Sequence, residues 1–176
     1  MASGNSATAF ALMALSYRVR DALKPRHLYL EEAGVREGMT VLDFGCGPGS
    51  YVQPSAQMVG QSGRVYALDR NPSAIKMTSD RIAKAGLTNV RTLLSDSATG
   101  LRYSSVDVVL LYDIFHHLAE PDVILKELHR VLKPSGILST HDHHLQVAQL
   151  TEAIESSGLF RRTLVGALTL TFEPDK

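Results

Sequence analysis

Short apolar segments typical of β-strands alternate with helix-like segments along most of this chain of 176 residues. A strand that is followed by a helix and a second strand forms a right-handed crossover, which makes the two strands parallel neighbours. The expected parallel strands are 40–44, 64–69, 90–95, 106–112 and 136–141. The pattern therefore predicts a doubly wound α/β fold with a mostly parallel sheet and helices on both faces.

Helix boundaries are marked by residues with known roles at helix ends. Asn71 precedes Pro72, which is the order expected for an N-cap and a first helical position, and Gly86 ends this helix. The apolar stripe of the segment 121–132 predicts a second helix, and a third helix is expected from Gln146 to Ser157.

The two ends of the chain depart from the alternating pattern. Segments 159–165 and 168–172 predict an antiparallel hairpin with a two-residue turn, Gly166-Ala167, which completes a seven-stranded sheet. Residues 1–34 predict a helical arm interrupted at Pro25, in front of a Rossmann-like domain that spans 35–176. Because the hairpin turn is short, we expect the arm to act as a partial lid, and its exposed apolar face leaves a homo-oligomer open. Its candidates for contact with the substrate are Tyr17 and Arg18, together with His27.

Composition excludes several classes of protein. The chain has 18 basic and 18 acidic residues, which disfavours a nucleic-acid partner, since polyanion binding needs an excess of Lys and Arg. The single cysteine, Cys46, excludes an internal disulfide and a multi-thiolate zinc site. We expect a cytoplasmic protein with no signal peptide and no membrane span.

A glycine-rich loop follows the first predicted strand. Gly45, Gly47 and Gly49 alternate with other residues, so the backbone can approach a ligand closely and present its amides at the start of a helix. The spacing G-x-G-x-G differs from the G-x-G-x-x-G of dinucleotide-binding loops. Asp43, two residues before the first glycine, suits an ammonium or sulfonium ligand better than a pyrophosphate.

From Val35 to Thr140 the sequence resembles the class I S-adenosylmethionine-dependent methyltransferases, and within them the small-molecule branch of the ubiquinone and menaquinone C-methyltransferases. The features that carry the resemblance are the glycine loop, the acidic residues Asp69 and Asp96 after the second and third strands, and the segments 107–118 and 131–136. The resemblance implies the strand order 3-2-1-4-5-7-6, with the last strand antiparallel.

The same resemblance implies S-adenosylmethionine as cofactor, S-adenosylhomocysteine as product, and a set of cofactor-binding residues. The three glycines would pack on the methionyl and ribose part, and Asp69 would accept from the ribose hydroxyls. Asp96 would accept from the adenine amino group, Ser97 would offer its backbone amide, and Arg70 would flank the ring. Tyr112 and Asp113 would border the methionyl amine, near Asp43. The full set implied for the cofactor is Asp43, Gly45, Gly47, Gly49, Asp69, Arg70, Asp96, Ser97 and Tyr112.

Five of the seven histidines lie in two clusters, at 116–117 and 141–144, which follow two neighbouring strands. They allow three interpretations. The histidines are structural, or His116 or His141 is a general base while His117 contacts the substrate. Alternatively, His117, His141, Asp142 and His143 form a metal site, although H-x-H at the end of a strand is only half of one. We assign His116 and His141 as catalytic and assign no metal.

The chain is therefore expected to transfer a methyl group to oxygen, carbon or nitrogen of a small-molecule acceptor by in-line displacement. The segment 113–116 reads Asp-Ile-Phe-His, which lacks the proline-rich pattern of amino-methylating DNA and RNA enzymes. The alternative is a catalytically idle subunit that binds the cofactor and docks a partner. A nicotinamide oxidoreductase is disfavoured by the glycine spacing and by Asp43.

Overall fold

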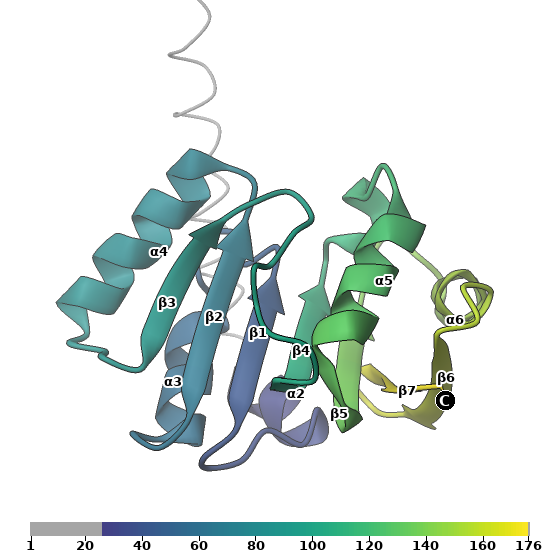
Figure 1. Ribbon diagram of the computed structural model, residues 1–176, viewed down its shortest axis with the longest axis horizontal. Coiled ribbons are helices and arrows are strands. Elements are labelled where there is room, and N and C mark those ends of the chain that lie inside the picture. The colour runs from purple at the N-terminus through teal and green to yellow at the C-terminus, as the bar shows by residue number, and fades with distance from the viewer. Residues whose placement is uncertain (1–25, 176) are drawn as a thin grey trace, which may run out of the picture.

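The computed structural model describes residues 26–175 and contains one mixed sheet of seven strands in the order β3-β2-β1-β4-β5-β7-β6 (Figure 1). This order and the doubly wound α/β architecture confirm the prediction. The strands are β1 (Thr40–Phe44), β2 (Arg64–Asp69), β3 (Val90–Leu94), β4 (Val106–Tyr112), β5 (Leu132–His141), β6 (Phe160–Val165) and β7 (Leu170–Pro174). The helices are α2 (Arg26–Glu32), α3 (Val52–Val59), α4 (Pro72–Lys84), the 3-10 turn η1 (Phe115–His117), α5 (Pro121–Val131) and α6 (Val147–Glu155).

The strands β1 to β5 are parallel, and β7 is antiparallel to both of its neighbours, β5 and β6. The chain winds outward from β1 in one direction through β2 and β3, and in the other direction through β4 and β5. The connections that leave the carboxyl ends of β1 and β4 therefore diverge. A doubly wound sheet opens a crevice for ligands at such a switch point.

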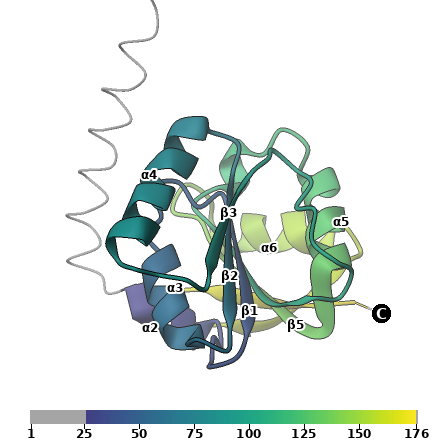
Figure 2. The same ribbon diagram turned by 60° about the vertical axis from the view of Figure 1, so that its left-hand side comes forward.

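Helices cover both faces of the sheet: α2, α3 and α4 lie on one face, and α5 and α6 lie on the other (Figure 2). Side chains alternate between the two faces along each strand, because a strand has a period of two residues. In β4, Val109 and Leu111 pack into the core beneath α5 and α6, whereas Val108 and Leu110 pack into the core beneath α2 and α3. This double burial explains the continuous apolar run of the strand.

The predicted helix boundaries have the expected physical basis. The side chain of Asn71 accepts a hydrogen bond of 2.9 Å from the amide of Ser73, and Pro72 occupies the first turn of α4. In α5 the buried residues form one stripe that faces the sheet. They are Ile124, Leu125, Leu128 and Val131.

Strand β5 begins four residues earlier than the predicted start at Gly136. It follows α5 directly, with Leu132 paired to Val106 and a register shift before Val108. The side chain of Lys133 binds Asp107 Oδ1 at 2.6 Å, which holds this first part of β5 against β4. The irregular register accommodates Pro134 within the strand, which is why the proline does not delay its start.

The predicted two-residue hairpin turn is wrong, because the loop between β6 and β7 has four residues, 166–169. The carboxylate of Glu32 accepts hydrogen bonds from the amides of Ala167, Leu168 and Thr169, at 3.0, 3.0 and 2.6 Å. These amides thus donate to a residue of α2 and do not extend the hydrogen bonds between β6 and β7. No local sequence pattern predicts this contact, because its partners are more than 130 positions apart.

Helix α2 packs into the body of the domain, where its residues Tyr29 and Leu30, and Ala33 directly after it, are buried in the core that also contains residues of α3. The proposed substrate residues Tyr17 and Arg18, like Pro25, lie outside the described residues. His27 is exposed on α2. Within residues 26–175, none of the helices has the length and apolar character that crossing a bilayer requires.

Candidate cofactor cleft and the adjoining histidine cluster

Two adjoining cavities lie at the carboxyl ends of the central strands. The outer cavity has a volume of about 270 Å³ and the inner cavity about 220 Å³. Both are lined by Gly45, Asp69, Arg70, Ile114 and His117. The two cavities therefore form one continuous cleft across the switch point of the sheet, and its walls come from the ends of β1, β2 and β4.

The three glycines of the loop after β1 all have positive φ, from 52° to 79°, which favours glycine over other residues. A Cβ at Gly45 would lie 2.7 Å from Ile114 Cγ1, and one at Gly49 would lie 2.8 Å from Thr78 Oγ1. A Cβ at Gly47 would meet no atom within 4 Å. Gly45 and Gly49 are thus required for packing, whereas Gly47 keeps the inner cavity open.

Hydrogen bonds fix this loop in place. The amides of Gly45 and Cys46 both donate to the carbonyl of Leu68 at the end of β2, at 2.8 and 2.9 Å. Thr78 of α4 donates its hydroxyl to the carbonyl of Gly47 at 3.0 Å. Burial raises the pKa of the Cys46 thiol, which agrees with a packing role for this residue and not with a nucleophilic one.

Asp69 connects the glycine loop to the end of β2. Its Oδ2 accepts from the amide of Gly47 at 2.9 Å, and its Oδ1 accepts from the amide of Asn71 at 2.8 Å. Each carboxylate oxygen retains a second acceptor site. The side chain lines both cavities. It therefore can accept from the two hydroxyls of a ribose while it shapes the loop.

Asp43 is a buried acidic residue that lines the inner cavity. Its side chain is buried, and its Oδ2 has no hydrogen-bond partner among residues 26–175. Burial, and then the charge of Asp69, raise the pKa of Asp43 from 3.8 to about 7. A buried acceptor without a partner is costly, and a cationic donor would relieve that cost. This geometry fits the ammonium group of the methionyl part of S-adenosylmethionine.

The other residues predicted to bind the cofactor divide between the two cavities. Asp96 and Ser97 line the outer cavity, whose lining also includes the apolar side chains of Leu118, Val123 and Ile124, while Arg70 lines both cavities. The Ser97 hydroxyl donates to Asp96 Oδ1 at 3.1 Å. Tyr112 lines the inner cavity, and its hydroxyl shares a hydrogen bond of 2.8 Å with Ser139.

Tyr51 and Ile114 are among the residues of the inner cavity that sequence reasoning missed. The Tyr51 ring lies 4.7 Å from the Tyr112 ring, and Arg26 donates to the Tyr51 hydroxyl at 2.7 Å. The position of Tyr51 directly after the glycine loop was an available signal. The contact with Arg26 was not predictable, because it brings α2 to the loop from 25 residues away.

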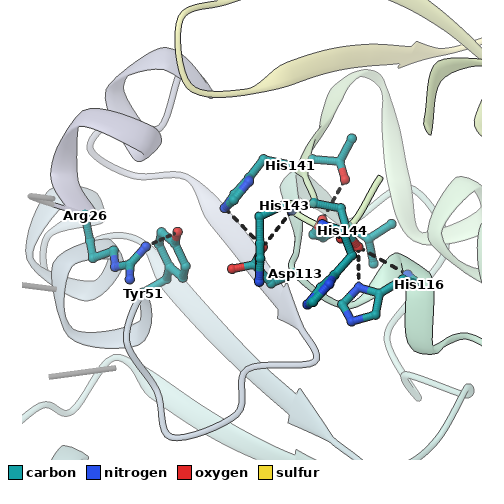
Figure 3. A network of polar contacts seen from close by, with 10 residues as sticks. Arg26, Tyr51, Asp113, His116, His141, His143 and His144 are labelled. Carbon is teal, nitrogen blue, oxygen red and sulfur yellow. Dashed lines mark hydrogen bonds and ion pairs between the residues drawn. The ribbon is translucent and has the colours of Figure 1, made fainter. Parts of the chain in front are cut away.

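The two histidine clusters come together, as the neighbouring strands predict, and Asp113 and Asp142 contact their histidines (Figure 3). Asp113 Oδ1 lies 2.6 Å from His143 Nδ1 and 3.4 Å from His141 Nε2. Asp142 Oδ2 lies 2.7 Å from His116 Nδ1. Partial burial would raise the pKa of Asp113, but His141 and His143 lower it below its ordinary value.

The histidines face different spaces. His117 lines both cavities of the cleft, and burial, followed by the charges of His116 and Arg70, lowers its pKa. His116 lines neither of these two cavities. His141 lines a separate cavity of about 150 Å³ between the end of β5, helix α6 and the 166–169 loop. His117 therefore lies at the cleft, whereas His116 and His141 line neither of its two cavities.

A doubly wound sheet with a glycine loop at β1, a carboxylate at the end of β2 and a cleft at the switch point defines a Rossmann-like domain that binds a nucleoside-containing cofactor. Comparison with known proteins identifies the family. Residues 35–170 match the family described as methyltransferase domain. A crystal structure of a SAM-dependent methyltransferase from Aquifex aeolicus superimposes with a TM-score of 0.76 at 30% identity, and the match covers 88% of this chain and 91% of that one. The chain belongs to the class I S-adenosylmethionine-dependent methyltransferases.

Curated relatives agree with this assignment. A demethylmenaquinone methyltransferase from Geobacillus stearothermophilus is 32% identical over 67% of this chain and 51% of its own length. An (S)-coclaurine N-methyltransferase from Thalictrum flavum subsp. glaucum is 29% identical over 81% of this chain and 40% of its own length. The chain thus spans about half the length of these relatives.

Proposed function

We propose that the protein transfers the methyl group of S-adenosylmethionine to a small-molecule acceptor at oxygen, carbon or nitrogen. The observation that carries the proposal is the buried carboxyl of Asp43, whose Oδ2 lacks a hydrogen-bond partner within residues 26–175 and which lines the same cavity as the open position at Gly47. The names of the relatives, which include an N-methyltransferase and a demethylmenaquinone methyltransferase, support a small-molecule acceptor.

When bound, S-adenosylmethionine supplies a methyl group already activated on a sulfonium. The chain must then position the acceptor in line with it and exclude water. The carboxylates of Asp43 and Asp69 hold the ligand's polar groups, and the backbone at Gly47 leaves room for the ligand beside them. Tyr112 and Ile114 form part of the wall of the inner cavity, where they exclude water.

The proton of an acidic acceptor would pass to a histidine. Asp142 accepts from His116 Nδ1, which leaves Nε2 of that ring as the proton acceptor. His141 lies beside the cavity of about 150 Å³, whose apolar lining includes Leu145, Leu150 and Leu168. We infer that this cavity receives the apolar body of the acceptor and that His116 or His141 acts as the base, with His117 in contact with the acceptor.

The test is turnover with a panel of phenols, quinols and amines, measured as S-adenosylhomocysteine formed. We expect His116→Ala or His141→Ala to slow turnover at least tenfold while S-adenosylhomocysteine still binds, because general bases contribute roughly 10²–10⁴-fold. Full activity in both variants would remove the base assignment. Tight cofactor binding with no turnover on any acceptor would favour the idle regulatory subunit.

The partner, the cellular compartment and the division of the chain are part of the same proposal. Balanced charge supports a small molecule and not a nucleic acid as partner, and the solitary cysteine supports a cytoplasmic protein. We also propose the division into an N-terminal arm, 1–34, and a catalytic domain, 35–176. Light scattering with and without residues 1–25 would test whether the arm mediates a homo-oligomer.

A further inference from the structure

Asp113, Asp142 and His143 form a cluster that the methyl-transfer proposal does not fully use. One ligand atom from each residue lies within 4.8 Å of the others. Two of them come from the ends of neighbouring strands, where Tyr112 of β4 is paired with His141 of β5. The register of the sheet thus places both carboxylates side by side directly after the strands end.

The carboxylate of Asp142 is held in one orientation. Its side chain is 0% exposed, and Oδ2 accepts from Nδ1 and from the backbone amide of His116, at 2.7 and 3.2 Å. Oδ1 accepts from the backbone amide of His144 at 3.0 Å. Carboxylates that bind metals are supported by such outer hydrogen bonds, which fix the orientation of the ligand.

Of the other two ligands, Asp113 is 11% exposed and His143 is open to solvent. His143 Nδ1 and Asp113 Oδ1 are 2.6 Å apart, and the His143 side chain is 54% exposed. His141 Nε2 lies 3.4 Å from the same Asp113 oxygen. In Figure 3 the side chains of His141 and His143 both point toward Asp113. A cation that entered from solvent would replace the proton shared by Asp113 and His143.

We propose that Asp113, Asp142 and His143 bind one divalent transition-metal ion such as Mn²⁺ or Zn²⁺. Two carboxylate oxygens and one imidazole nitrogen suit these borderline ions, whereas Mg²⁺ and Ca²⁺ prefer oxygen ligands alone. Three protein ligands leave at least one coordination position open.

The location of the cluster indicates what fills the open position. Asp113 lines the inner cavity of the cofactor cleft, and Asp142 lines the apolar cavity of about 150 Å³ on the other side. The ion would therefore lie between the two spaces. This step rests on the proposed methyl transfer. An ion at this place would bind a hydroxyl group of the acceptor, which assigns the acceptor to the class of hydroxyl compounds, such as phenols or enols. A bound ion would lower the pKa of the coordinated hydroxyl, whose proton then passes to the histidine base proposed above while the electron pair stays on oxygen.

The experiment is calorimetric titration of chelator-treated, tag-free protein with Mn²⁺ and with Zn²⁺. We expect one ion per chain at micromolar affinity. His143→Ala should weaken binding at least tenfold, and Asp113→Asn should weaken it further, because loss of a charged ligand removes most of the attraction. His144→Ala, in the same loop, and His129→Ala, on α5, are matched controls that should change the affinity by less than threefold.

Absence of stoichiometric binding, or equal affinities in the wild type and His143→Ala, would overturn the metal site. Because the His143 side chain is largely exposed, this variant should fold, and its melting temperature checks that. Each protein is also titrated with S-adenosylhomocysteine. Metal binding without cofactor binding would contradict only the methyltransferase proposal, whereas cofactor binding without metal binding would contradict only the metal site.

Discussion

At the scale of single residues, Asp43 is placed where the ligand-free protein gains nothing from its charge. The group is buried, its pKa is raised to about 7, and its Oδ2 has no hydrogen-bond partner within residues 26–175. Asp43→Asn should therefore stabilise the ligand-free protein by roughly 1–3 kcal/mol at pH 8, because it removes a desolvated charge. The same change should weaken S-adenosylhomocysteine binding at least tenfold. Thermal unfolding and calorimetry measure the two effects, and a variant that loses stability and keeps its affinity would contradict this role.

The raised pKa of Asp43 also predicts how binding depends on pH. The favourable contribution of the protonated group to stability is complete below pH 3.8 and is lost as the pH rises toward the folded pKa of about 7. A cationic ligand needs the carboxylate, so binding releases a proton below that pH. The dissociation constant of S-adenosylhomocysteine should rise about tenfold for each pH unit below 7. This slope should vanish in Asp43→Asn, and an equal slope in both proteins would assign it to another group.

The glycine loop allows packing and ligand binding to be separated. Gly49→Ala should destabilise the fold by roughly 2–4 kcal/mol, since its Cβ would meet Thr78 Oγ1 at 2.8 Å and φ is +79°. Gly47→Ala has only the cost of its positive φ, about 1 kcal/mol, because its Cβ would enter open space. It should nevertheless weaken cofactor binding at least tenfold by projecting into the inner cavity. Chemical denaturation measures the loss of stability and calorimetry measures the loss of affinity. Unchanged affinity in Gly47→Ala would show that the ligand does not bind against the glycine loop.

At the scale of elements, hydrogen bonds to the Glu32 carboxylate connect α2 to the loop between β6 and β7. Partial burial would raise its pKa, but hydrogen bonds from Thr169, Leu168 and Ala167 lower it below 4.5. The stabilisation is therefore present above pH 4.5 and is lost as the pH falls through the folded pKa. Glu32→Gln should cost roughly 1–2 kcal/mol at neutral pH and less in acid. The adjacent exposed Glu31→Gln is the control, and equal melting temperatures for the two variants would show that the contact is not stabilising.

The same element shows where sequence reasoning reached its limit. Local signals such as Asn71-Pro72 predicted the helices, and the alternating pattern with the glycine loop predicted the strands and the cleft. The four-residue loop at 166–169 and the position of α2 depend on a carboxylate that lies far away in sequence, and no propensity encodes that contact. The early start of β5 likewise depends on Lys133 binding Asp107 across the sheet.

At the scale of the whole molecule, the sheet brings three spaces together at one edge: the outer and inner cavities of the cleft, and the apolar cavity beside His141. The sequence predicted that the two histidine clusters would lie together, because their strands are neighbours. It did not predict that His117 lines the cleft while His116 does not, since both residues lie in the short 3-10 turn η1 and no sequence pattern shows which of the two rings faces the cleft. The pairing of His116 with Asp142 is likewise a tertiary feature.

The central claim is that the cleft at the switch point binds S-adenosylmethionine and not a dinucleotide. The most direct measurement is calorimetric titration of the protein with S-adenosylhomocysteine, with NADH as the control. We predict one site per chain of micromolar affinity for S-adenosylhomocysteine, no heat from NADH, and a ligand-induced stabilisation of about 2.7 kcal/mol at a hundredfold excess over the dissociation constant. A folded protein that binds NADH, or that binds neither ligand, would contradict the account.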